Sequence, residues 1–175
     1  MRVLIAAGSI ALLAGGAFAQ QPELKIDPAI LDSCLAMVKE EFGKDENATY
    51  DICIGKAAAA CTETDGAYNT VGMSTCIGSE LDYWDAKLNA AYQAVMAQAE
   101  ATDKEMTELG SAAEKQVPFL KEMQRNWISY RDSACAYERS RWGGGSGGGP
   151  AEVGCVMELT AQQYLRLHAY EDQDG

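Results

Sequence analysis

Few residue types in this sequence could carry out chemistry. The chain has one histidine, His168, which excludes multi-histidine metal sites and most histidine-dependent catalysis. Carboxylates lie close together at Asp82 and Asp85 and at Glu40 and Glu41. Glycoside cleavage needs two carboxylates that face each other across a cleft in different environments, whereas these pairs follow the surfaces of predicted helices. We therefore expect no enzyme, no cofactor and no metal site.

The glycine tract WGGGSGGGP at 142–150 contains Ser146 and follows Arg139 and Arg141. A catalytic serine would need a G-x-S-x-G turn with an acid–base partner, and a phosphate-binding loop would need a following Gly-Lys-Ser/Thr. Neither pattern is present. The tract is predicted to be a flexible surface loop.

The first 19 residues (MRVLIAAGSIALLAGGAFA) have the pattern of a secretory signal peptide. Arg2 precedes an apolar stretch that ends in Ala17-Phe18-Ala19, so we expect cleavage near Ala19 and a periplasmic or secreted product. The alternative is a membrane anchor, but the stretch is shorter than a bilayer span and contains glycines. No later segment is apolar enough to span a membrane.

Six cysteines follow this segment, an even number that in an oxidising compartment suggests three disulfides. Zinc binding is the competing interpretation, but the sequence contains no C-x-x-C pair. Fifteen pairings are possible. We expect the three that close local loops: Cys34–Cys53, Cys61–Cys76 and Cys135–Cys155.

The charge balance narrows the class of partner. There are 26 acidic against 14 basic residues, so the formal net charge is −12, and it becomes −13 once Arg2 is lost with the signal peptide. Such a surface repels nucleic acid and anionic membranes and favours a cationic partner.

Apolar residues recur at helical spacing through most of the chain, and no strand pattern of any length is present. We predict an all-α fold: an antiparallel bundle of three main helices with an N-terminal helical hairpin that carries a disulfide. Residues 64–75 are predicted to be a loop, and 171–175 a frayed tail. The helices are expected at 28–42, 48–63, 79–102, 118–141 and 151–170.

An ordered set of residues resembles the LprI-like lysozyme-inhibitor family over about 76–170, which leaves 20–75 as an extension. The set comprises Cys76, Leu88, Asn89, Tyr92, QRNWISYRDSAC at 124–135, GGS at 144–146, Cys155 and Thr160. The resemblance implies a secreted or periplasmic all-helical domain with lysozyme inhibition as its activity. The family usually has an arginine three residues after the threonine. Here that position is Gln163, and Arg166 is the candidate replacement.

Most of these motif residues are predicted to be structural. We expect the aromatic residues to pack on Trp84 and Tyr92, and Arg131 to pair with Asp85 or Asp82. Polar members are expected to satisfy contacts between helices. The motif residues in question are Leu88, Asn89, Tyr92, Gln124, Arg125, Trp127, Tyr130, Arg131, Asp132 and Thr160.

Two functional hypotheses follow. In the first, the protein binds a basic lysozyme or another muramidase, and Ser146, Arg139 and Arg141 donate hydrogen bonds to carboxylates in the enzyme's cleft. In the second, it is a non-catalytic envelope interaction or scaffold module without a lysozyme partner. A salt-sensitive complex with a basic lysozyme would distinguish them. The sequence does not define the oligomeric state.

Overall fold

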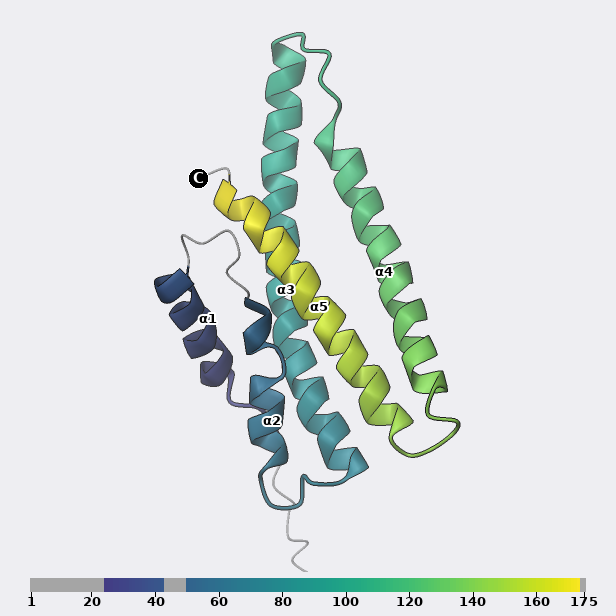
Figure 1. Cartoon of the computed structure of the whole chain (residues 1–175). Helices are drawn as coiled ribbons and strands as arrows, with labels where there is room; N and C mark the ends of the chain where they lie inside the picture. The colour runs from purple at the N-terminus through teal and green to yellow at the C-terminus, as the bar shows by residue number, and fades with distance from the viewer. Residues whose placement is uncertain (1–23, 43–49, 174–175) are drawn as a thin grey trace, which may run out of the picture.

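The computed structural model describes residues 24–42 and 50–173, and within these ranges it contains helices and no strand (Figure 1). The all-α prediction is confirmed. The predicted signal peptide and its cleavage site lie outside the described residues, as do the last two residues of the predicted tail. The elements are α1 (Pro28–Phe42), the 3₁₀ helix η1 (Tyr50–Cys53), α2 (Lys56–Thr62), α3 (Thr70–Glu108), α4 (Gln116–Ser140) and α5 (Gly148–Gln173).

The three long helices, α3, α4 and α5, form a bundle in which successive helices are antiparallel, so that α5 packs along α3 and runs in the same general direction (Figure 1). In the same view α4 lies on one side of α3, and α1 and α2 lie on the other. Asp103 of α3 closes the turn into α4, because its carboxylate accepts hydrogen bonds from the N–H groups of Gln116 (2.7 Å) and Val117 (3.2 Å). Within the described ranges, no helix combines the length and the apolar character needed to cross a membrane.

The observed helix bounds correct the prediction at several ends, although the first helix has the predicted bounds. The helix expected at 48–63 is split into η1 and α2, because Gly55 adopts a left-handed conformation with φ of 85°. The long helix α3 begins at Thr70, inside the expected loop, since the Asn69 side chain accepts hydrogen bonds from Val71 N and Gly72 N. It also continues to Glu108, beyond the expected end.

The last helix begins at Gly148, inside the tract that was predicted to be entirely loop. Pro150 lies in its first turn, where a missing N–H has no consequence because those groups have no helical partner. The last two glycines of the tract, Gly148 and Gly149, therefore form the start of this helix.

The main core is built around Trp84, whose side chain is fully buried. Its ring contacts Tyr83 with centroids 5.1 Å apart and Tyr164 of α5 at 5.8 Å. Other fully or almost fully buried members are Leu31, Ala57, Leu88, Ala161 and Leu167, which come from α1, α2, α3 and α5. The N-terminal hairpin thus shares one core with the bundle.

A buried carboxylate connects α2 to α3. Glu80 has no exposed surface. Its Oε1 accepts hydrogen bonds from Gly55 N (2.6 Å) and Trp84 Nε1 (2.9 Å), and its Oε2 accepts one from Ala58 N (2.7 Å). These backbone donors lie at the start of α2, where N–H groups lack helical partners. Glu80 therefore caps α2 from a neighbouring helix.

Three disulfides join successive elements, and no cysteine in the described part of the chain is free. They are the three pairs expected from local loop closure: Cys34–Cys53 links α1 to η1, Cys61–Cys76 links α2 to α3, and Cys135–Cys155 links α4 to α5. Each bridge typically contributes about 2–4 kcal/mol, mainly by restricting the unfolded chain.

Candidate functional site

The glycine loop, residues 141–147, connects α4 to α5 at one end of the bundle. Gly143 and Gly144 have φ of 55° and 83°, a left-handed backbone that favours glycine. The Trp142 ring lies against Gly147 so closely that a side chain there would overlap it. The loop is also tightened by a hydrogen bond from Gly145 N to Trp142 O (2.9 Å). Its glycines thus permit a compact turn with an exposed tryptophan.

The three residues predicted to contact a partner lie in and beside this loop. Arg139 forms an ion pair with Glu152 of α5, and Arg141 Nη1 contacts Glu138 Oε2 at 2.8 Å. Ser146 is exposed, and its hydroxyl has no hydrogen bond to another described residue. Both arginines are therefore already paired, and Ser146 is the predicted donor that remains available.

A shallow cavity of about 340 Å³ lies at the base of the same loop, between the end of α4 and the start of α5. Of the predicted contact residues only Arg139 lines it. The other lining residues are Ala136, Ser140, Gly144, Gly145, Gly148 and Gly149.

A second concave surface, the α4–α5 groove, has a volume of about 380 Å³ and contains two of the motif residues, Trp127 and Tyr130. It combines aromatic, amide and guanidinium side chains from two adjacent helices. Residues three and four apart share one face of a helix, which explains why the contributors recur at that spacing. They are Met123, Trp127 and Tyr130 of α4, and Leu159, Gln162, Gln163 and Arg166 of α5.

The amide of Gln163 takes the place expected for the family arginine. Gln163 is only 5% exposed, and its Nε2 donates a hydrogen bond to Gln124 Oε1 across the helix interface at 3.0 Å. Arg166 does not substitute for it in an ion pair. Among the described residues Arg166 has no acidic partner, and its exposed side chain lines the groove. A neutral amide contact thus joins the two helices here.

The prediction that Arg131 pairs with Asp85 or Asp82 is wrong. Its Nη2 contacts Asp132 Oδ1 at 2.9 Å, and its guanidinium lies over the Trp127 ring, 4.9 Å from the centroid. Asp82 and Asp85 lie on α3, whereas α4 as a whole packs more extensively against α5 than against α3.

The predicted packing of the aromatic motif residues is only partly right. Trp127 packs against the edge of the main core and is partly buried, as is Tyr92. Tyr130 is 61% exposed and is not a core residue. Trp84 makes its ring contacts with Tyr83 and Tyr164 instead.

The remaining motif residues divide between core and surface. Leu88 and Thr160 are buried, and the Thr160 hydroxyl has no partner in the described part of the chain. Asn89 was expected to bridge helices, but its side chain donates to Asp85 Oδ2 (2.9 Å) on its own helix. Arg125 is exposed, which also contradicts the expected buried polar contact.

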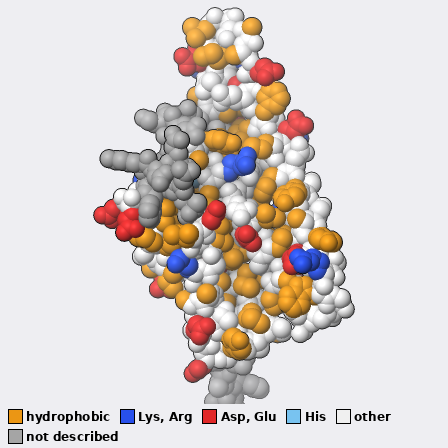
Figure 2. Space-filling model, in the orientation of Figure 1, with side chains coloured by type: hydrophobic (Ala, Val, Ile, Leu, Met, Phe, Trp, Pro, Cys, Tyr) orange, Lys and Arg blue, Asp and Glu red, His pale blue; other side chains and the backbone are white. Residues whose placement is uncertain are grey.

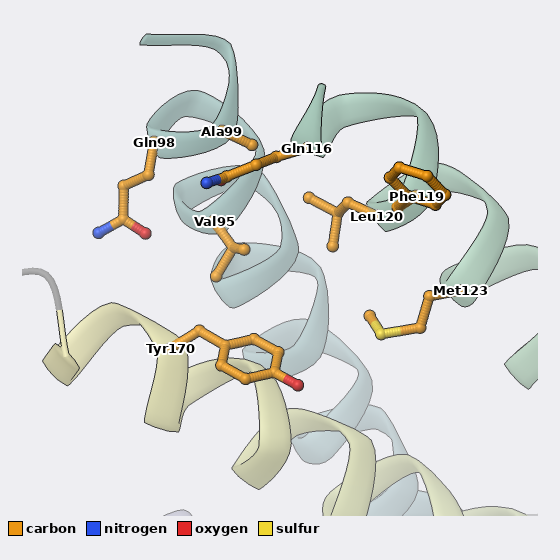
Figure 3. A pocket seen from close by; sticks show the side chains of 8 residues that line it. All are labelled: Val95, Gln98, Ala99, Gln116, Phe119, Leu120, Met123 and Tyr170. Atoms are coloured by element: carbon orange, nitrogen blue, oxygen red, sulfur yellow. The ribbon is translucent and has the colours of Figure 1, made fainter. Parts of the chain in front are cut away.

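Sequence reasoning missed an apolar cavity of about 360 Å³ where α3, α4 and the end of α5 meet (Figure 3). Apolar side chains and Tyr170 form most of the wall, two glutamines contribute amides, and no charged residue of the described ranges lines it. Helix periodicity marks these residues as apolar but does not show that the helices diverge. The lining residues are Val95, Gln98, Ala99, Gln116, Phe119, Leu120, Met123 and Tyr170.

The surface along α4 carries several large exposed apolar side chains, although the protein as a whole is acidic. Figure 2 shows hydrophobic side chains spread over the α4 side of the face in view, with carboxylates scattered between them and over the rest of that face. Large exposed hydrophobic residues of α4 and the loop after it are Phe119, Ile128, Tyr130, Tyr137 and Trp142. The described residues contain no cluster of acidic, histidine or cysteine side chains suited to a metal ion.

Comparisons of the sequence with known proteins agree with the family resemblance of these motifs. The family model for lysozyme inhibitor LprI matches residues 61–167, which places the Cys61–Cys76 disulfide inside the family region, earlier than the predicted start. An uncharacterized protein of Rhizobium meliloti (strain 1021) is 33% identical over 117 residues, which cover 66% of this chain and 84% of the relative. An uncharacterized 17.7 kDa protein of Rhodobacter capsulatus is 26% identical over 118 residues, covering 67% and 73%. No solved structure matches the chain. The chain belongs to the LprI lysozyme-inhibitor family.

Proposed function

We propose that this protein is a periplasmic or secreted inhibitor that binds a basic muramidase and blocks its cleft. The observation that carries the proposal is the match of residues 61–167 to a family of lysozyme inhibitors. The net charge of −12 supports it, because an acidic surface accelerates encounter with a basic enzyme. Three disulfides support an oxidising compartment.

The glycine loop is the element that we propose enters the cleft. Ser146 presents a hydroxyl and a backbone N–H two residues before the start of α5, and a helix N-terminus favours negative charge. Catalytic carboxylates of a glycosidase are suitable acceptors. The Cys135–Cys155 bridge holds the two flanking helices together, which lowers the ordering cost of binding. Arg139 and Arg141 are proposed to contribute less, since each is paired with a glutamate.

A titration of the purified oxidised protein into a cell-wall hydrolysis assay tests this function. We expect inhibition of a basic lysozyme that weakens as salt rises to about 0.15 M, where the Debye length is about 8 Å. Ser146→Asp should weaken inhibition because it places a carboxylate opposite the enzyme's carboxylates. Ser33→Asp on α1 is the matched control, since Ser33 is also exposed and lies far from the loop in the sequence.

The possible results of these assays distinguish the inhibitory function from the glycine loop as its binding element. Absence of inhibition at micromolar excess over several lysozyme classes would reject the inhibitor proposal and favour a non-catalytic envelope module. Inhibition that survives Ser146→Asp and the combined change of Ser146, Arg139 and Arg141 would retain the function but reject the loop as its binding element.

A further inference from the structure

The α4–α5 groove has a composition that the proposed role of the glycine loop does not use. We propose that this groove is a saccharide-binding site for a short glycan that carries an acetamido group and a carboxylate. The proposal concerns a different surface from the glycine loop and does not depend on muramidase inhibition.

The aromatic side chains provide the platform. Trp127 forms part of the groove wall, and the Arg131 guanidinium lies over its ring at 4.9 Å, which holds the ring in place. Tyr130 lies one turn further along α4 and is 61% exposed, so its ring is open to a ligand. A rigid wall beside an open aromatic ring suits the flat, partly apolar face of a pyranose.

A buried amide supplies the hydrogen-bonding specificity. Gln163 lines the groove although the residue is only 5% exposed. Its Nε2 is used by Gln124, and no described residue donates a hydrogen bond to its Oε1. The contact with Gln124 fixes the orientation of the amide, leaving a carbonyl oxygen as acceptor. An acetamido N–H is a donor that matches it.

The charge at the groove selects among saccharides. Arg166 lines the groove and has no acidic partner among the described residues, although acidic residues outnumber basic ones by 26 to 14. A planar guanidinium recognises a carboxylate through two parallel hydrogen bonds. The volume of about 380 Å³ is near the lower end of ligand pockets, which suits roughly one or two sugar rings.

Isothermal titration calorimetry with the oxidised protein tests the proposal. The probe is the disaccharide of N-acetylglucosamine and N-acetylmuramic acid, which carries both groups. The comparison ligands are neutral N,N′-diacetylchitobiose, which has acetamido groups but no carboxylate, and free lactate. We expect saturable binding of the probe, with diacetylchitobiose bound about tenfold more weakly because it lacks the charge-assisted contact.

Paired variants locate the site. Arg166→Gln and Tyr130→Ala should each weaken binding of the probe about tenfold or more. The matched controls are Arg125→Gln and Tyr137→Ala, two exposed residues of α4 that do not line the groove. These controls should bind the probe as the wild type does.

Three results would overturn the proposal: no saturable binding of the probe at millimolar concentration, equal losses in the groove variants and their controls, or lactate binding as tight as that of the disaccharide. Inhibition of a muramidase by a protein that fails this test would leave the proposed function intact. Conversely, glycan binding without muramidase inhibition would support the saccharide-binding site in the groove but not the proposed inhibitory function.

Discussion

Replacement of Glu80 should reveal how strongly one buried carboxylate holds the N-terminal hairpin to the bundle. The carboxylate accepts three hydrogen bonds, from Gly55 N, Ala58 N and Trp84 Nε1, at 2.6–2.9 Å. Glu80 is fully buried, and Ala58 and Trp84 are 4% and 0% exposed. Because Ala58 and Trp84 are buried, water cannot readily reach their N–H groups and replace the lost acceptor.

The size of the effect follows from these contacts. A hydrogen bond to a charged group contributes about 1.5–3 kcal/mol net. The cost of burying the carboxylate itself offsets part of the sum, and removing one partner of a buried charged network typically costs about 3–5 kcal/mol. We therefore expect Glu80→Ala to lower the free energy of unfolding by about 3–5 kcal/mol. Glu80→Gln should lower the free energy of unfolding by roughly 2–4 kcal/mol, because the NH₂ group of the glutamine side chain would face an N–H donor.

Chemical denaturation followed by circular dichroism measures this loss, and hydrogen exchange at the Ala58 amide reports whether α2 detaches. Glu100→Gln, an exposed glutamate of the same helix, is the control and should change stability by less than about 0.5 kcal/mol. A Glu80→Gln protein as stable as this control would refute the reasoning. Unchanged protection of the Ala58 amide would refute the capping role.

Two further predictions concern α3. Burial and the hydrogen bond from its hydroxyl to Asp32 Oδ1 (2.7 Å) raise the pKa of Tyr83 well above its usual value. The unfolded chain releases this proton near pH 10, so the stabilisation that Tyr83 contributes is complete below that pH and declines above it. Tyr83→Phe should therefore reduce the loss of stability with rising pH in a series of denaturation curves at alkaline pH. An unchanged slope would contradict the role of the Tyr83 hydroxyl. Gly72→Ala should destabilise by about 1–3 kcal/mol, because the added methyl group would overlap the Ala67 backbone. Gly78→Ala, in the same helix with nothing within 4 Å, should stabilise by about 0.5–1 kcal/mol; equal thermal shifts for the two would refute the steric argument.

The sequence by itself determined the all-helical fold class, the cysteine pairs expected from local loop closure, and the family. Helix α1 has the predicted bounds because Asp27 and Pro28 are local start signals that need no distant contact. The ordered motif from Gln124 to Cys135 identified the family because it depends on residue order alone.

The tertiary structure decided what each helix face contacts. Periodicity marks a face as apolar but does not choose its neighbour, so it did not show that Arg131 lies over Trp127 or that Tyr130 is exposed. Glu80 occupies a core position of α3, four residues after Cys76 and four before Trp84, and this break in an apolar stripe was the available signal for a buried carboxylate. Its role still required knowledge of α2, because the donors that stabilise a buried charge belong to a different element. The same holds for the α4–α5 groove, which exists only because Gln163 and Arg166 of one helix lie beside Trp127 of another.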